Sequence, residues 1–123
     1  LLTDLNEIFL ACCEENLSKI NIEWSNKKSL CIVICSKGYP DKFKKNVEIS
    51  NINKIILRKN EFLFHAGTLK KNEKTFSIGG RVLNFTTLSE DFGLAREAII
   101  KNVTELNWDG GFYRNDIGYK VIK

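Results

Sequence analysis

Methionine is absent from this sequence of 123 residues, and proline and histidine each occur only once. A chain without methionine contains no translation start, so we expect the sequence to be a piece of a longer protein. Long apolar runs are also missing: no stretch approaches the roughly 18 apolar residues of a membrane-spanning helix, and no signal peptide is present. These absences predict a cytoplasmic protein with no membrane partner.

Metal-binding and disulfide patterns are missing as well. The four cysteines form no C-x-x-C pair, and only His65 could join them as a nitrogen ligand, which argues against a zinc site. Cys12 and Cys13 are adjacent, while Cys31 and Cys35 fall on one face of a predicted strand, about 13 Å apart. We therefore expect four buried, reduced thiols and no metal.

No part of the sequence has the concentrated positive charge of a nucleic-acid-binding surface. The net charge is +4, but the lysines are scattered along the chain instead of gathering in runs with aromatic residues between them. Hydrophobic residues make up 43% of the sequence, which is enough for one core. We expect a globular domain with no nucleic-acid partner.

Two stretches have apolar residues at the three- and four-residue spacing that predicts an amphipathic helix. The first covers 1–13, where Leu5 and Phe9 lie on one stripe. The second covers 90–106 and follows Ser89, a residue type that favours the N-cap position.

Between these helices, β-prone runs alternate with turn residues. The continuous apolar run Leu30–Cys35 predicts a strand buried on both faces. Two further runs, over 61–68 and 75–88, are separated by the polar segment 69–74, which is typical of an antiparallel hairpin with an exposed tip. The sequence thus predicts an α+β fold, with helix 1–13 to one side and helix 90–106 packed on a small antiparallel sheet from 30–36, 55–66, 74–88 and 112–119.

The predicted hairpin carries glycine in both arms, at Gly67 and at the pair Gly79 and Gly80, and Arg81 follows the pair. Glycine inside a strand marks a bulge or a close approach of another backbone or a ligand. A guanidinium beside exposed N–H groups can bind an anion such as phosphate. The alternative is a bulged hairpin whose arginine faces water or pairs with a carboxylate.

Four motifs follow one another along nearly the whole chain: CIVICSKGYP at Cys31–Pro40, FHAGT at Phe64–Thr68, GGRVL at Gly79–Leu83 and WDGGFYRNDIG at Trp108–Gly118. In this order they resemble the C-terminal region of the glycinamide ribonucleotide synthetase family, also called phosphoribosylamine–glycine ligase. Departures from the family pattern, at Asp41, Thr87 and Ser89, fall on turns and leave the motif residues intact.

The resemblance implies an ATP-grasp ligase of purine biosynthesis. Such an enzyme phosphorylates the glycine carboxylate with ATP and joins it to 5-phosphoribosylamine, giving glycinamide ribonucleotide, ADP and phosphate. Residues 1–22 are then the trailing helix and linker of the ATP-grasp domain, and 23–123 are the C-terminal domain. ATP and Mg²⁺ are bound by the missing domains, so no catalytic residue, metal site or cofactor is expected in this stretch, and alone it is expected to be inactive.

The resemblance also gives the hairpin a role. We expect five residues to bind the 5′-phosphate of phosphoribosylamine, by analogy with related ATP-grasp enzymes: Arg81, Gly79, Gly80, Gly67 and Thr68. The partners expected are the missing N-terminal and ATP-grasp domains and the substrates phosphoribosylamine and glycine. The alternative is a non-catalytic α+β binding or interaction module with a basic hairpin.

Overall fold

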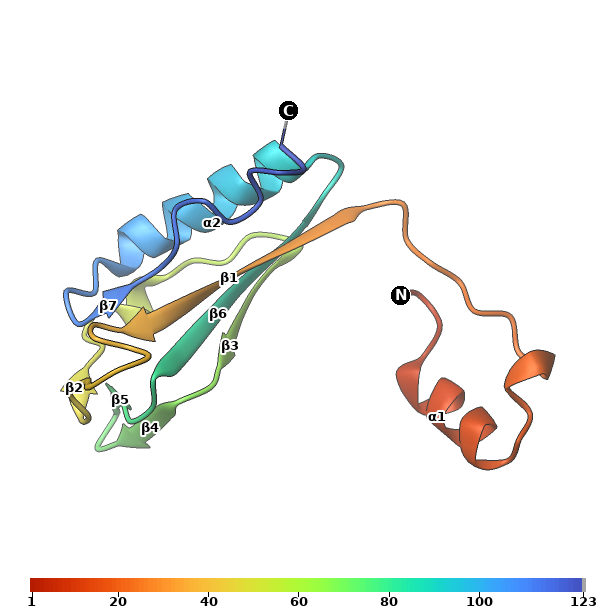
Figure 1. Ribbon diagram of the computed structural model, residues 1–123, viewed down its shortest axis with the longest axis horizontal. Helices are drawn as coiled ribbons and strands as arrows, with labels where there is room; N and C mark the ends of the chain where they lie inside the picture. Colours follow the sequence, from red (N-terminus) through yellow and green to blue (C-terminus); the bar gives the residue numbers. More distant parts are fainter. Residues whose placement is uncertain (123) are drawn as a thin grey trace.

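A four-stranded antiparallel sheet forms the centre of the protein in the computed structural model, which describes residues 1–122 (Figure 1). Its strands lie in the order β3 (Glu61–His65), β6 (Arg81–Ser89), β1 (Lys28–Ser36) and β7 (Gly111–Phe112). A second, three-stranded sheet contains β2 (Val47–Glu48), β5 (Lys74–Ser77) and β4 (Thr68–Lys71). Helix α2 (Phe92–Leu106) lies along one face of the larger sheet, which confirms the α+β class.

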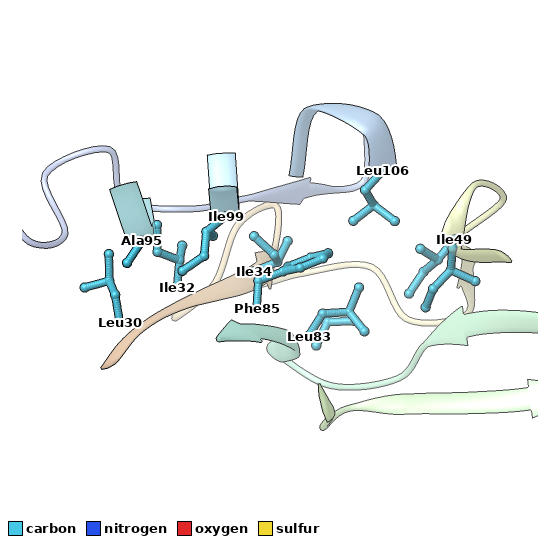
Figure 2. Close-up of a cluster of buried hydrophobic side chains, with 11 residues drawn as sticks. Leu30, Ile32, Ile34, Ile49, Leu83, Phe85, Ala95, Ile99 and Leu106 are labelled. Atoms are coloured by element: carbon cyan, nitrogen blue, oxygen red, sulfur yellow. The ribbon is translucent and has the colours of Figure 1, made fainter. Parts of the chain in front are cut away.

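The core lies between α2 and this sheet. Figure 2 shows Leu30, Ile32 and Ile34 of β1 pointing toward the helix. The helix side of the core consists of Ala95, Ile99 and Leu106, and β6 contributes Leu83 and Phe85. The intervening residues of β1 point to the other face, where no helix of residues 1–122 covers them, and are exposed or half-buried. The prediction that this strand is buried on both faces was therefore wrong, because only one face is covered.

The same geometry corrects the prediction for the thiols. All four cysteines are free, as expected, but they are not buried: Cys12, Cys13 and Cys31 are exposed and Cys35 is half-buried. Strand β1 places its two cysteines on the open face of the sheet, opposite the core.

The predicted hairpin forms, but its arms are longer and divide between two sheets. Strands β3 and β6 pair in the larger sheet, and β4 and β5 pair in the smaller one. The segment 69–74 is not a loop: most of it is strand, and only Asn72 and Glu73 form the turn. Both have positive φ, of 49° and 60°, which is the combination of a two-residue type I′ turn.

The N-cap of helix α2 lies two residues later than predicted. Ser89 ends β6, and the N-cap is Asp91, whose carboxylate accepts hydrogen bonds from the N–H groups of Gly93 at 2.6 Å and Leu94 at 3.1 Å. Such bonds satisfy donors that the first turn of a helix leaves unpaired. The helix ends at Leu106, and the capping residue after it, Asn107, has a left-handed φ of 42°.

Two of the predicted strands are shorter than expected. Residues 55–60 follow the 3₁₀ helix η2 (Ile52–Lys54) without strand pairing, and β3 begins only at Glu61. The carboxylate of Glu61 accepts hydrogen bonds from the buried Asn102 side chain of α2 and from the Arg58 N–H, which fixes the start of β3 against the helix. Near the C-terminus of the described chain only β7 is strand, and residues 115–121 form turns.

Helix α1 (Leu5–Cys13) lies apart from the sheet, joined to β1 by an extended segment that includes the 3₁₀ helix η1 (Leu17–Lys19) (Figure 1). Its apolar stripe is open to solvent: Leu5 is 50% exposed and Phe9 is 58% exposed. The helix therefore lies to one side, as expected. Within residues 1–122, no helix combines the length and the apolar character that crossing a bilayer requires.

Candidate functional site

Strand β6 contains a bulge at the position where Arg81 emerges. In the pairing with β1, Ile34 lies opposite Leu83 but Cys35 lies opposite Arg81, so one additional residue, Val82, interrupts the register. Val82 is fully buried, whereas Arg81 is exposed. A bulge is a common means of redirecting a side chain. The glycine pair before Arg81 had indicated a bulge at this place.

Gly67 and Gly79 touch each other where the long hairpin divides between the two sheets. The carbonyl of Gly67 accepts hydrogen bonds from the N–H groups of Ile78 at 2.8 Å and Gly79 at 3.3 Å, and the Gly67 N–H donates to the Arg81 carbonyl at 2.9 Å. A Cβ added to Gly67 would lie 2.7 Å from the Cα of Gly79. Contact between the two arms therefore explains these two glycines without a ligand.

Gly80 has a different neighbour. A Cβ at this position would lie 2.1 Å from the Cδ2 atom of Tyr39, so the aromatic ring rests directly against the Gly80 backbone. Ser36, at the end of β1, holds the glycine pair in place: its hydroxyl donates to the Gly79 carbonyl and its N–H donates to the Gly80 carbonyl, both at 2.8 Å.

Arg81 lines a hollow of about 540 Å³ on the open face of the sheet, together with Val33, Tyr39, Ala66, Gly80 and Asn84. Each ion pair within residues 1–122 joins other side chains, so the Arg81 guanidinium has no carboxylate partner in the described chain. Pairing with a carboxylate, one of the two alternatives for this arginine, is not observed. A guanidinium without an internal partner, at the edge of a hollow, can bind an anion in a bidentate manner.

The structure brings only part of the predicted phosphate site together. Arg81 and Gly80 line the hollow, but Thr68 does not, and its hydroxyl lies 2.9 Å from the Nδ1 atom of His65. The N–H groups of Gly67, Thr68 and Gly79 donate to backbone carbonyls. These three residues therefore shape the hairpin and do not offer free donors to a ligand.

Sequence reasoning missed four residues of the hollow: Val33, Tyr39, Ala66 and Asn84. Val33 and Asn84 are partners in the ladder between β1 and β6, so they share the open face. Because side chains alternate between the two faces of a strand, the sequence of each strand could have indicated that these two residues lie on the same face. The packing of Tyr39 on Gly80 joins positions 41 residues apart in the sequence, and no local pattern indicates it.

A second hollow, of about 370 Å³, adjoins the first. The two share Val33 and Tyr39, but the walls of the second are mainly apolar. Its remaining lining comes from the open face of β1, from the turn after it and from the segment that starts at β7: Cys31, Cys35, Pro40, Phe112, Tyr113, Arg114 and Ile117. Arg114 forms a bidentate ion pair with Asp116, with N–O distances of 3.0 and 2.6 Å.

The surroundings of Cys35 predict a graded reactivity of the thiols. Burial raises the pKa of the Cys35 thiol above its ordinary value, and the nearby charge of Arg81 partly opposes this shift. Because thiolate is the reactive form, we expect Cys35 to react with Ellman's reagent more slowly at pH 8 than the three exposed cysteines.

This difference should shrink as the pH rises through the raised pKa of Cys35, since the thiol then ionises. After denaturation without reductant, four equivalents should react. Equal rates for all four thiols in the native protein would contradict the burial of Cys35, and fewer than four equivalents after denaturation would contradict the free thiols.

Metal-ligating side chains are scattered over the described part of the chain. Among residues 1–122, no three histidine, cysteine, aspartate or glutamate side chains gather where they could hold a metal ion. Mg²⁺ in phosphoryl-transfer sites is held by carboxylates together with substrate phosphates. The described residues supply no such cluster of three, and no step through Mg²⁺ with ATP is assigned to them.

Sequence comparison places this chain among known proteins. It is 37% identical over 117 residues to a phosphoribosylamine–glycine ligase of Caldanaerobacter subterraneus, a match that covers 95% of this chain and 27% of that protein. It is also 37% identical over 123 residues to the ligase of the same name from Haemophilus influenzae, covering 100% of this chain and 28% of the relative. The chain thus spans about a quarter of the length of the curated relatives it matches.

Structural comparison agrees. The crystal structure of the phosphoribosylamine–glycine ligase from Thermotoga maritima superposes with a TM-score of 0.67 and 27% sequence identity, over 93% of this chain and 28% of that one. A family model described as "Phosphoribosylglycinamide synthetase, C domain" matches residues 29–120. This match includes the bulge, the glycines and both hollows, and by it the chain belongs to the phosphoribosylglycinamide synthetase C-domain family.

Proposed function

We propose that this chain is the C-terminal part of a phosphoribosylamine–glycine ligase, the enzyme that joins 5-phosphoribosylamine and glycine with ATP to give glycinamide ribonucleotide, ADP and phosphate. The family match and the names of the full-length relatives support this function over a non-catalytic module with a basic hairpin. Four free thiols suit the reducing cytoplasm in which we place the enzyme.

Residues 1–22 are, in this proposal, the trailing helix and linker of the ATP-grasp domain, and 23–123 are the C-terminal domain. The separation of α1 from the sheet supports a boundary in the extended segment before β1. In the full-length ligase, carboxylates of the ATP-grasp domain hold Mg²⁺ together with the phosphates of ATP. This stretch supplies no catalytic residue.

The contribution of this chain is to hold the 5′-phosphate of phosphoribosylamine. The observation that carries this role is the guanidinium of Arg81, which has no carboxylate partner among residues 1–122 and lines the hollow on the open face. Gly80 leaves room for the ring of Tyr39, which packs on its backbone and closes one side of the hollow. Gly67, Gly79 and Thr68 act indirectly, by holding the hairpin that presents Arg81.

Replacing Arg81 with alanine in the full-length ligase tests this role. A charge-assisted hydrogen bond contributes about 1.5–3 kcal/mol, so the KM for phosphoribosylamine should rise by roughly 10- to 150-fold. The KM values for ATP and glycine should stay nearly unchanged. The KM of Arg81→Lys for phosphoribosylamine should lie between those of the wild type and of Arg81→Ala, because lysine keeps the charge but loses the bidentate fork.

Arg58→Ala is the matched control, since it removes the same charge from an exposed position outside the hollow. It should leave all three KM values as they are. An Arg81→Ala enzyme whose KM for ATP changes instead, or whose kinetics do not change at all, would contradict the phosphate assignment.

A further inference from the structure

The two hollows on the open face form one continuous surface with two different ends. They share Val33 and the ring of Tyr39. Arg81 lines the first hollow and Cys35 lines the second, and these residues are direct partners in the ladder between β6 and β1. Partners in an antiparallel ladder lie about 5 Å apart, so the cation stands at the boundary of the apolar hollow.

Phosphoribosylamine fills only one of these ends. Its ribose carries hydroxyl groups, an amine and a phosphate, which do not match the mainly apolar walls of the second hollow. The one charged residue of that lining, Arg114, is already paired with Asp116. Small-molecule sites are mainly apolar concavities of about 300–1,000 Å³ in which a few polar groups fix the orientation of the ligand. The second hollow, at about 370 Å³, has this character, and Arg81 at its boundary supplies the charge.

We propose that the joined hollows bind a nucleoside 5′-monophosphate, with its phosphate on Arg81 and its heterocyclic base in the apolar hollow between Tyr39 and Phe112. The ribose then crosses the boundary beside Val33, which both hollows share. Because the phosphate occupies the same cation, such a nucleotide competes with phosphoribosylamine. This inference rests on the proposed role of Arg81 and adds a ligand class to that site.

The test compares three probes on the 123-residue chain by isothermal calorimetry: AMP, ribose 5-phosphate and adenosine. Stacking of a base on an aromatic side chain contributes about 1–3 kcal/mol, so AMP should bind about 5- to 150-fold more tightly than ribose 5-phosphate. Adenosine should also bind more weakly than AMP, because it lacks the phosphate. Magnesium should not change these affinities.

Two substitutions separate the ends of the site. Arg81→Ala should weaken the binding of both AMP and ribose 5-phosphate. Cys31→Asp places a carboxylate in the apolar hollow alone, at an exposed position where the fold tolerates it. This variant should bind AMP more weakly but bind ribose 5-phosphate as the wild type does. As a measurement that needs no variant, AMP should shift the amide NMR signals of Cys35 and Phe112 in addition to those of Gly80 and Arg81.

The outcomes are distinct. Equal binding of AMP and ribose 5-phosphate, both lost in Arg81→Ala, would overturn this inference and leave the proposed phosphate site intact. If ribose 5-phosphate binds to Arg81→Ala as tightly as to the wild type, both the nucleotide inference and the proposed phosphate site are overturned. AMP shifts confined to residues 41–46, which line neither hollow, would place the nucleotide elsewhere and overturn the inference as well.

Discussion

Replacing Phe85 with alanine should lower the free energy of unfolding by about 3–5 kcal/mol, the usual cost of removing a buried aromatic side chain. Phe85 is 1% exposed and lies in the centre of β6, opposite Ile32 of β1 and Leu63 of β3. Its ring fills the space beneath α2, so the truncation removes apolar contacts and leaves a cavity that the two-layer core cannot close. Urea denaturation followed by circular dichroism measures the loss.

Phe64→Ala is the matched control, because it removes the same ring from the same sheet. Phe64 is 54% exposed on the open face, where it stacks on Phe62 with ring centroids 6.1 Å apart. Its truncation should cost less than about 1 kcal/mol, since much of the ring is already in water. Similar losses for the two variants would mean that the open face is as tightly covered as the core.

Gly67→Ala should destabilise the protein by close to 3 kcal/mol, the upper end of the usual range for overpacking. The new Cβ would lie 2.7 Å from both the Cα of Gly79 and the carbonyl oxygen of Arg81. Both are backbone atoms tied into the hairpin by hydrogen bonds, so neither can move aside as the end of a side chain could.

Gly79→Ala tests this explanation from the other side of the same contact. Its Cβ would meet the Cα of Gly67 at 3.0 Å and the Arg81 carbonyl at 3.5 Å, distances that small shifts of the backbone accommodate. We expect this variant to lose less than half as much stability as Gly67→Ala in the same urea titration. The reverse order would show that the backbone contact does not set the requirement for glycine.

Much of the fold could be predicted from local patterns in the sequence. The stripe that includes Ala95 and Ile99 identified α2, and the run at Leu30–Cys35 identified β1. Burial on one face only could not be read from that run, because Cys31 and Val33 are as apolar as their neighbours. What leaves them open is the absence of a second covering layer in the described chain, which is a property of the tertiary structure.

The hairpin shows a second limit. Lys70 and Lys71 made the segment before the turn look like a loop, yet both lie in β4, paired with Thr75 and Lys74 of β5. Charged side chains are common on exposed edge strands, where they discourage pairing with other chains. Prediction of the candidate site had a similar limit. Arg81 and Gly80 could be predicted from their local motif, but the packing of Tyr39 on Gly80 depends on the whole fold.

The bulge in β6 decides which residues of this strand face the core and which face the open side of the sheet. Leu83, Phe85 and Thr87 all face the helix, so strict alternation would turn the next odd-numbered residue, Arg81, into the core as well. The unpaired Val82 reverses the parity: valine enters the core, and arginine joins Val33 and Asn84 on the open face. Regular pairing of the same residues without the bulge would bury the cation and expose the valine, so core and site depend on the same bulge.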